Sequence, residues 1–113
     1  MAVETKSREI GPGVAAVEVA GRVMMGPESE KIVAAVDGLL NKGYRTIVFD
    51  LSGITSIDST GIGRFIYSFN RIRAAGGEMR MAGASGHVLE AFHVSLLDTV
   101  FPFFDNVEAA AKG

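Results

Sequence analysis

The chain has 113 residues, of which 48% are apolar, and its formal net charge is -2 at pH 7. This length fits one domain over residues 1–113 that is large enough to build a hydrophobic core. There is no excess of Lys and Arg, which argues against direct binding to nucleic acid or to an anionic membrane surface. The absence of cysteine excludes disulfides and thiolate metal sites. No long apolar run and no signal-peptide pattern is found, so we expect a soluble cytoplasmic protein without membrane insertion.

The first part of the chain predicts a hairpin followed by a helix. The sequence Gly11-Pro12-Gly13 is a strong turn signal, and the residues at 14–19 are typical of a strand. Pro27 suits the first position of a helix and Gly43 is the expected stop, so a helix is expected over 27–42. Apolar residues recur in it at helical spacing, at Ile32, Val33, Val36, Leu39 and Leu40.

The middle of the chain predicts a buried strand and an amphipathic helix. The stretch 46–51 is an apolar, largely β-branched run without alternation, which is typical of a parallel strand covered on both faces. The stretch 51–57 is expected to be a loop, and Gly76-Gly77 is expected to end the helix that follows. The apolar face of that helix is assigned to Ile62, Phe65, Ile66, Phe69 and Ile72. The rest of its surface is assigned to Arg64, Ser68, Arg71 and Arg73.

The last part of the chain predicts a strand over 78–82, an apolar edge element over 101–104, and a final short helix capped by Asp105 or Asn106. Between the two strands, a third helix is marked by Val88, Leu89, Phe92 and Leu96. The paired methionines are expected to fill the core, at Met24, Met25, Met79 and Met81. Strands that alternate with helices in this order predict an α/β fold, a mixed sheet of four to five strands with helices packed on it.

The most informative stretch is Asp58-Ser59-Thr60-Gly61-Ile62-Gly63, at the start of the second helix. Asp, Ser and Thr are all good N-caps, so one interpretation is plain helix capping. If Asp58 is the cap, Ser59 takes the first helical position and its hydroxyl can point outward. A phosphate there would be favoured by the helix dipole and by free amides. It would also add a charge of about -1.5 to -2 beside Asp58.

Two other interpretations of this stretch are weaker. A dinucleotide fingerprint lacks its third glycine, because Ile66 stands there, and the expected approach loop is too long. A Ser-His-Asp triad could be drawn from Ser59 with His87 or His93 and with Asp50 or Asp98, but nothing in the spacing selects it. Two histidines six residues apart do not share a helix face, so no metal site is expected. We therefore expect no catalytic residue and no cofactor.

Asp50 lies near the end of the expected buried strand, where a carboxylate is costly unless it is hydrogen-bonded. It is expected to accept backbone amides of the following segment, near Ser52 or Ser56. We also expect it to anchor the segment that carries Ser59.

The sequence IVFDLSGITSIDSTGIG at 47–63, followed by RIRAAGGE at 71–78, resembles STAS domains. More narrowly, it resembles bacterial anti-sigma factor antagonists. The resemblance implies that Ser59 is phosphorylated by a partner kinase that is also the anti-sigma factor. It implies that the unphosphorylated form binds this kinase and releases a sigma factor, and that a serine phosphatase resets the switch. The chain is then not an enzyme.

A partner-binding surface is expected around the motif, at Asp58, Ser59, Thr60, Gly61, Gly63, Arg64 and Ser68. The two glycines are expected to allow close approach by a neighbouring strand or by a partner. The resemblance leaves open a non-switching adaptor in a lipid-transport or stress-signalling assembly, and a small hydrolase that uses Ser59 is a third hypothesis. A homodimer through the first strand or the edge at 101–104 is also left open.

Overall fold

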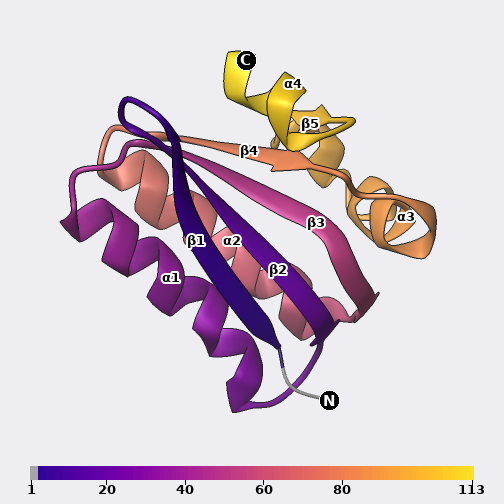
Figure 1. Ribbon diagram of the computed structural model, residues 1–113. Helices are drawn as coiled ribbons and strands as arrows, with labels where there is room; N and C mark the ends of the chain where they lie inside the picture. The colour runs from indigo at the N-terminus through magenta and orange to yellow at the C-terminus, as the bar shows by residue number, and fades with distance from the viewer. Residues whose placement is uncertain (1–2) are drawn as a thin grey trace.

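The computed structural model describes residues 3–113 and arranges five strands in one mixed sheet (Figure 1). The strands β1 (Glu4–Gly11) and β2 (Val14–Val23) form an antiparallel hairpin, as the turn signal predicted. The strands β3 (Thr46–Ile57), β4 (Glu78–Ala82) and β5 (Phe103–Phe104) follow in parallel, in the order β1-β2-β3-β4-β5. The α/β fold with a mixed sheet is therefore confirmed.

Helices alternate with the parallel strands and connect them. They are α1 (Glu30–Asn41), α2 (Ser59–Ala74), α3 (Gly86–Val94) and α4 (Val107–Lys112), with short 3-10 turns η1 (Pro27–Ser29) and η2 (Leu97–Thr99). The last helix is capped by Asn106, whose side-chain oxygen accepts a hydrogen bond from the Ala109 amide at 2.8 Å. Among the described residues, no helix combines the length and the apolar character that a membrane span requires.

The two faces of the sheet bury different clusters. Figure 1 shows α1 and α2 lying along one face. Side chains of a strand alternate between faces, so Ile47 and Phe49 of β3 join the larger core on this side while Val48 points the other way. The opposite face carries a smaller cluster with α4, made of Ala16, Val48, Ala82, Val107 and Ala110.

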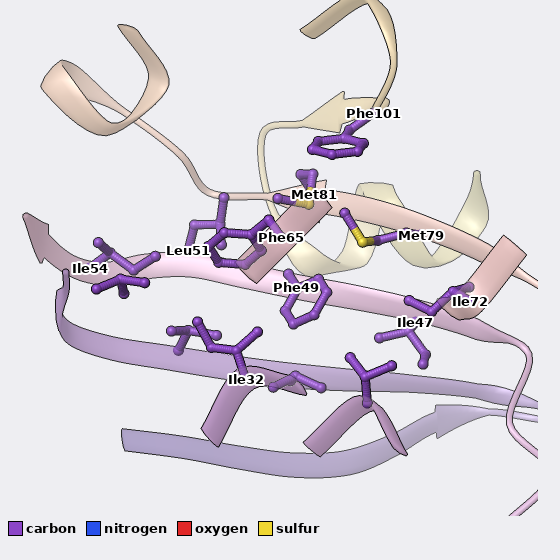
Figure 2. Close-up of a cluster of buried hydrophobic side chains, with 14 of the residues drawn as sticks. Ile32, Ile47, Phe49, Leu51, Ile54, Phe65, Ile72, Met79, Met81 and Phe101 are labelled. Carbon is purple, nitrogen blue, oxygen red and sulfur yellow. The ribbon is translucent and has the colours of Figure 1, made fainter. Parts of the chain in front are cut away.

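Aromatic side chains link the layers of the larger core, which Figure 2 shows in close-up. The Phe65 ring from α2 lies edge-on to the Phe49 ring from β3, with centroids 5.2 Å apart. On its other side it contacts the Phe92 ring from α3, at 5.6 Å. Edge-to-face pairs of this kind stabilise beyond the area that they bury. Phe65 thus packs α2 against the sheet and α3.

The stretch 51–57 is not the loop that the sequence predicted, because β3 continues to Ile57. The pairing of β2 with β3 extends to Val23 and Ile57 and contains two register shifts. Gly53 makes this possible, since a Cβ there would lie 3.0 Å from the Ala20 Cβ. Only Asp58 therefore separates the end of β3 from the start of α2.

Three smaller expectations also fail. The expected helix at 27–42 begins with the 3-10 turn η1, and only then becomes α1. Met25 is 81% exposed rather than buried, although Met79 and Met81 do fill the core as expected. Leu96 lies outside the third helix, in a left-handed conformation with φ of 61°.

The outer edge of β1 carries charged side chains. Lys6, Arg8 and Glu9 are all exposed on this strand, which pairs with β2 on one side. The other edge of the sheet, β5, is two residues long.

Candidate functional site

The candidate site is the turn between β3 and α2, where Asp58 separates the strand from the helix. Of the three residues that could cap this helix, Asp58 is the N-cap, and its Oδ1 accepts a hydrogen bond from the Gly61 amide at 2.9 Å. The hydrogen bond from the Gly61 amide is the main cause that lowers the pKa of Asp58 from its ordinary value. Partial burial acts in the opposite direction and raises the pKa, while a hydrogen bond from the Met25 amide lowers it further. The carboxylate is thus a fixed negative charge beside Ser59.

Ser59 occupies the first position of α2 and is exposed to solvent. The first amides of a helix have no carbonyl partner within the helix, and the dipole is positive at this end. An anion attached to the Ser59 hydroxyl would therefore be stabilised by the helix start. Thr60, the second hydroxyl of the motif, is half-buried.

Gly61 and Gly63 play different roles, although the sequence placed them together. A Cβ on Gly61 would overlap the Val23 carbonyl oxygen and lie 2.9 Å from the Ile57 Cγ1. Its close approach is therefore to the end of β2, within the chain. A Cβ on Gly63 would meet nothing within 4 Å. Gly63 thus faces open space that a partner could enter.

A surface groove of about 730 Å³ runs between α1 and α2 beside the motif. Thr60, Gly63 and Arg64 line it from α2, together with Tyr67. The acidic residues Glu30 and Asp37 line it from α1. Near Asp37 the two helices are joined by an ion pair, in which the Arg71 Nε lies 2.5 Å from the Asp37 Oδ1.

The expectation that Ser68 faces a partner is wrong. Its side chain is fully buried, and its hydroxyl donates to the Arg64 carbonyl at 2.8 Å. Ser68 stands three residues after Phe65 and four before Ile72, so helical spacing places it on the core face.

The outer surface of α2 carries exposed apolar side chains that the sequence analysis missed. Ile66 had been assigned to the apolar face but is 38% exposed, and Tyr67 is 50% exposed. Arg64 is half-buried, and its Nε donates to the Ser29 hydroxyl at 3.0 Å, so it packs toward α1. Ile66 follows Ser59 by seven residues, about two helical turns, so the two residues lie on the same face of α2. This spacing is the signal in the sequence that could have identified the exposed stripe.

Asp50 bonds locally, as one part of its interpretation predicted. Its Oδ1 accepts hydrogen bonds from the Ser52 amide at 3.0 Å and the Ser52 hydroxyl at 2.7 Å. Asp50 lies in the middle of β3 rather than near its end, because the strand continues to Ile57. Both of these hydrogen bonds are with Ser52, and the start of α2 is bonded by Asp58, so the role of Asp50 as an anchor of the Ser59 segment stays a prediction.

The histidines have other partners. The His87 Nε2 lies 2.9 Å from the Thr55 carbonyl, and the His93 Nδ1 lies 2.6 Å from the Asp98 Oδ2. Neither of these hydrogen bonds involves Ser59. No group of three residues that could hold a metal ion is found within residues 3–113.

Known proteins resemble this chain both in sequence and in fold. The family model for the STAS domain matches residues 6–110. A candidate anti-sigma factor antagonist, BtrV of Bordetella bronchiseptica, is 29% identical over 89 residues, which cover 79% of this chain and 77% of BtrV.

Two solved structures show the same fold. The crystal structure of a candidate anti-sigma factor antagonist of Thermotoga maritima superposes with a TM-score of 0.85 at 21% identity, covering 96% of this chain and 92% of that chain. The phosphorylated form of SpoIIAA of Bacillus superposes with a TM-score of 0.73 at 17% identity, covering 96% of this chain and 98% of that chain. With the match over residues 6–110, these likenesses lead to one conclusion: the chain belongs to the STAS domain family.

Proposed function

We propose that this chain is an anti-sigma factor antagonist that works by partner switching. The observation that carries the proposal is the exposed Ser59 at the first position of α2, directly after the N-cap Asp58. In its unphosphorylated form the chain binds an anti-sigma factor and releases a sigma factor, in the cytoplasm. The likeness to BtrV and to the Thermotoga maritima protein supports this assignment.

In the switching step, the anti-sigma factor acts as a serine kinase. The Ser59 oxygen attacks the γ-phosphorus of ATP, the bond from that phosphorus to ADP breaks, and the hydroxyl proton passes to a base on the kinase. A serine phosphatase reverses the modification by adding water across the new bond. The chain supplies the substrate hydroxyl and the surface around it, and it is not itself an enzyme.

The effect on binding is electrostatic. The phosphate adds a charge of about -1.5 to -2 next to the Asp58 carboxylate. A partner surface that is apolar at this point then binds more weakly, because the phosphate must be desolvated in the complex. An acidic partner surface binds more weakly because like charges repel. A coupling of about 1–3 kcal/mol changes the affinity about 5- to 150-fold, so a single phosphate is sufficient.

The docking surface follows from the exposed residues of α2. Ser59, Gly63 and Ile66 stand at helical spacing on one exposed stripe, and Tyr67 lies beside it on the groove. The absent side chain of Gly63 leaves room for a partner to reach the helix backbone next to Ser59. The stripe supplies apolar contact area, which drives most protein association.

The test is a phosphorylation assay with the anti-sigma factor from the same organism, purified, and Mg-ATP. Mass spectrometry is expected to place one phosphate on Ser59, in the wild-type chain and in Thr60→Ala, and none on Ser59→Ala. In calorimetry with the same protein, Ser59→Asp is expected to bind more weakly than Ser59→Ala.

A different outcome would change the assignment. Tight binding that Ser59→Asp leaves unchanged would contradict the switch and favour the adaptor alternative. Labelling by a serine-directed covalent probe that disappears in Ser59→Ala would instead favour the hydrolase hypothesis.

A further inference from the structure

The loop between β2 and η1 presents Met25 next to the candidate site. Its side chain is 81% exposed, the largest value among the exposed large apolar side chains of the described residues. Gly26 follows with φ of 127°, a conformation that side chains other than glycine rarely adopt, and Pro27 then starts η1. The loop therefore has a defined shape that turns the chain immediately after Met25.

This loop is fixed against the first turn of α2. The Met25 amide donates to the Asp58 Oδ2 at 2.9 Å, while the Oδ1 of the same carboxylate accepts from Gly61. The Asp58 amide in turn donates to the Val23 carbonyl at 3.3 Å. The residue directly before Ser59 thus holds both the helix start and the methionine loop.

The exposure of Met25 has no explanation within the fold. A long apolar side chain in water contributes nothing to the core, and methionine is well suited to irregular apolar surfaces of a partner because it is flexible and polarizable. A shallow hollow of about 210 Å³ adjoins it, lined by Arg22, Met24, Met25 and Glu28. The loop therefore offers an apolar contact beside a small cleft.

We propose that Met25 is a second docking contact for the kinase that phosphorylates Ser59, and that Asp58 couples this contact to the phosphate. This inference rests on the proposed function. A kinase that reaches the Ser59 hydroxyl must cover its surroundings, and the Met25 backbone is one hydrogen bond away from the residue before Ser59. The partner of this contact is an apolar recess on the kinase, next to its active site.

The coupling operates through the donors that Asp58 uses. A phosphate on Ser59 repels the neighbouring carboxylate and competes with it for amides of the first turn. The repulsion moves the carboxylate away from the position in which its Oδ2 accepts from the Met25 amide, and the loop is released. Phosphorylation thus removes an apolar contact as well as adding charge.

The first experiment measures phosphorylation kinetics with the purified anti-sigma factor of the same organism. Met25→Ala is expected to lower kcat/KM about tenfold, mainly through KM, because a buried interface anchor contributes more than 1 kcal/mol. Met25→Leu is expected to keep most of the wild-type kcat/KM, because leucine also offers a large apolar side chain. Val94→Ala is the matched control, since Val94 is 73% exposed at the end of α3.

The outcomes separate the two proposals. If the wild-type chain is not phosphorylated on Ser59, the proposed function fails, and this inference fails with it. If the wild-type chain is phosphorylated and Met25→Ala is as good a substrate as Val94→Ala, the proposed function stands and the docking role of Met25 is overturned.

The second experiment tests the coupling without a partner. Hydrogen exchange followed by NMR is expected to show lower protection of the Met25 amide in Ser59→Asp than in Ser59→Ala. Equal protection in the two variants would overturn the coupling through Asp58.

Discussion

Gly61 at the start of α2 packs against the backbone carbonyl of Val23 at the end of β2, leaving no room for a side chain. Two glycines of the same helix, Gly61 and Gly63, therefore stand in opposite surroundings, one in tight contact and the other in open space. Substitution by alanine distinguishes them.

Gly61→Ala is expected to lower the free energy of unfolding by about 3 kcal/mol, because the new methyl group must displace backbone. Gly63→Ala is expected to raise it by up to about 1 kcal/mol, because alanine is the better helix former and meets nothing. Urea unfolding monitored by circular dichroism measures both. Similar effects of the two substitutions would contradict the close approach at Gly61.

Asp58 is expected to stabilise the fold as an N-cap and to make that stability depend on acid. Asp58→Ala is expected to cost about 0.5–2 kcal/mol at pH 7, while Asp58→Asn, which still caps, costs less. The pKa of Asp58 is lowered below its ordinary 3.8, so its contribution is present above that value and is lost as the pH falls through the lowered pKa.

Urea unfolding at pH 7 and pH 3 tests this expectation. The wild-type chain should lose more stability between the two pH values than Asp58→Asn does, because the amide does not titrate. An equal loss in both proteins would show that the carboxylate is not held as described.

His93 and Asp98 form an exposed pair across the turn after α3. The hydrogen bond that the His93 imidazole donates to the Asp98 carboxylate is the main reason that the pKa of His93 is raised above 6.5, and the nearby Glu90 adds to it. The stabilisation is therefore fully present below pH 6.5 and is lost as the pH rises through the raised pKa.

We expect this effect on stability to be small, since both side chains are accessible to water. An NMR titration of His93 should give a pKa above 6.5 in the wild-type chain. The value should fall in Asp98→Asn, and an unchanged titration would exclude the pair in solution.

Phe65 is expected to be the most sensitive residue of α2. Phe65→Ala should lower the free energy of unfolding by about 3–5 kcal/mol, because it opens a cavity between the Phe49 and Phe92 rings. Phe69, which is half-buried, serves as the control, and Phe69→Ala should cost less. Denaturant unfolding measures both, and equal losses would be inconsistent with the packing around Phe65.

The sequence predicted most of the fold from local signals. The hairpin turn, the strand at 78–82 and the capped helix start at 58–60 all match the structure. These elements depend on residues close together in the chain, such as glycines in turns and short polar side chains at helix starts. Local chemistry was therefore sufficient to place the start of α2 within the residues Asp58 to Thr60, and the structure selects Asp58 as the cap.

The errors occurred where distant segments decide the outcome. β3 continues to Ile57 because β2 pairs with it, and its Ser and Gly residues gave no local sign of a strand. Ser68 was assigned by its polar side chain, although its spacing from Phe65 and Ile72 places it in the core. Met25 was assigned to the core by its apolar side chain, although its amide is hydrogen-bonded to Asp58, a residue 33 positions later in the chain, and its side chain is exposed.

The charged side chains on the outer edge of β1 affect the tendency of the protein to aggregate at high concentration. An open edge strand can recruit strands from other chains and lead to insoluble aggregates. Lys6, Arg8 and Glu9 are exposed along this edge, so an incoming apolar strand would have to desolvate charge. The exposed charges on β1 therefore oppose aggregation through this edge of the sheet, on a strand that is distant in the sequence from Ser59.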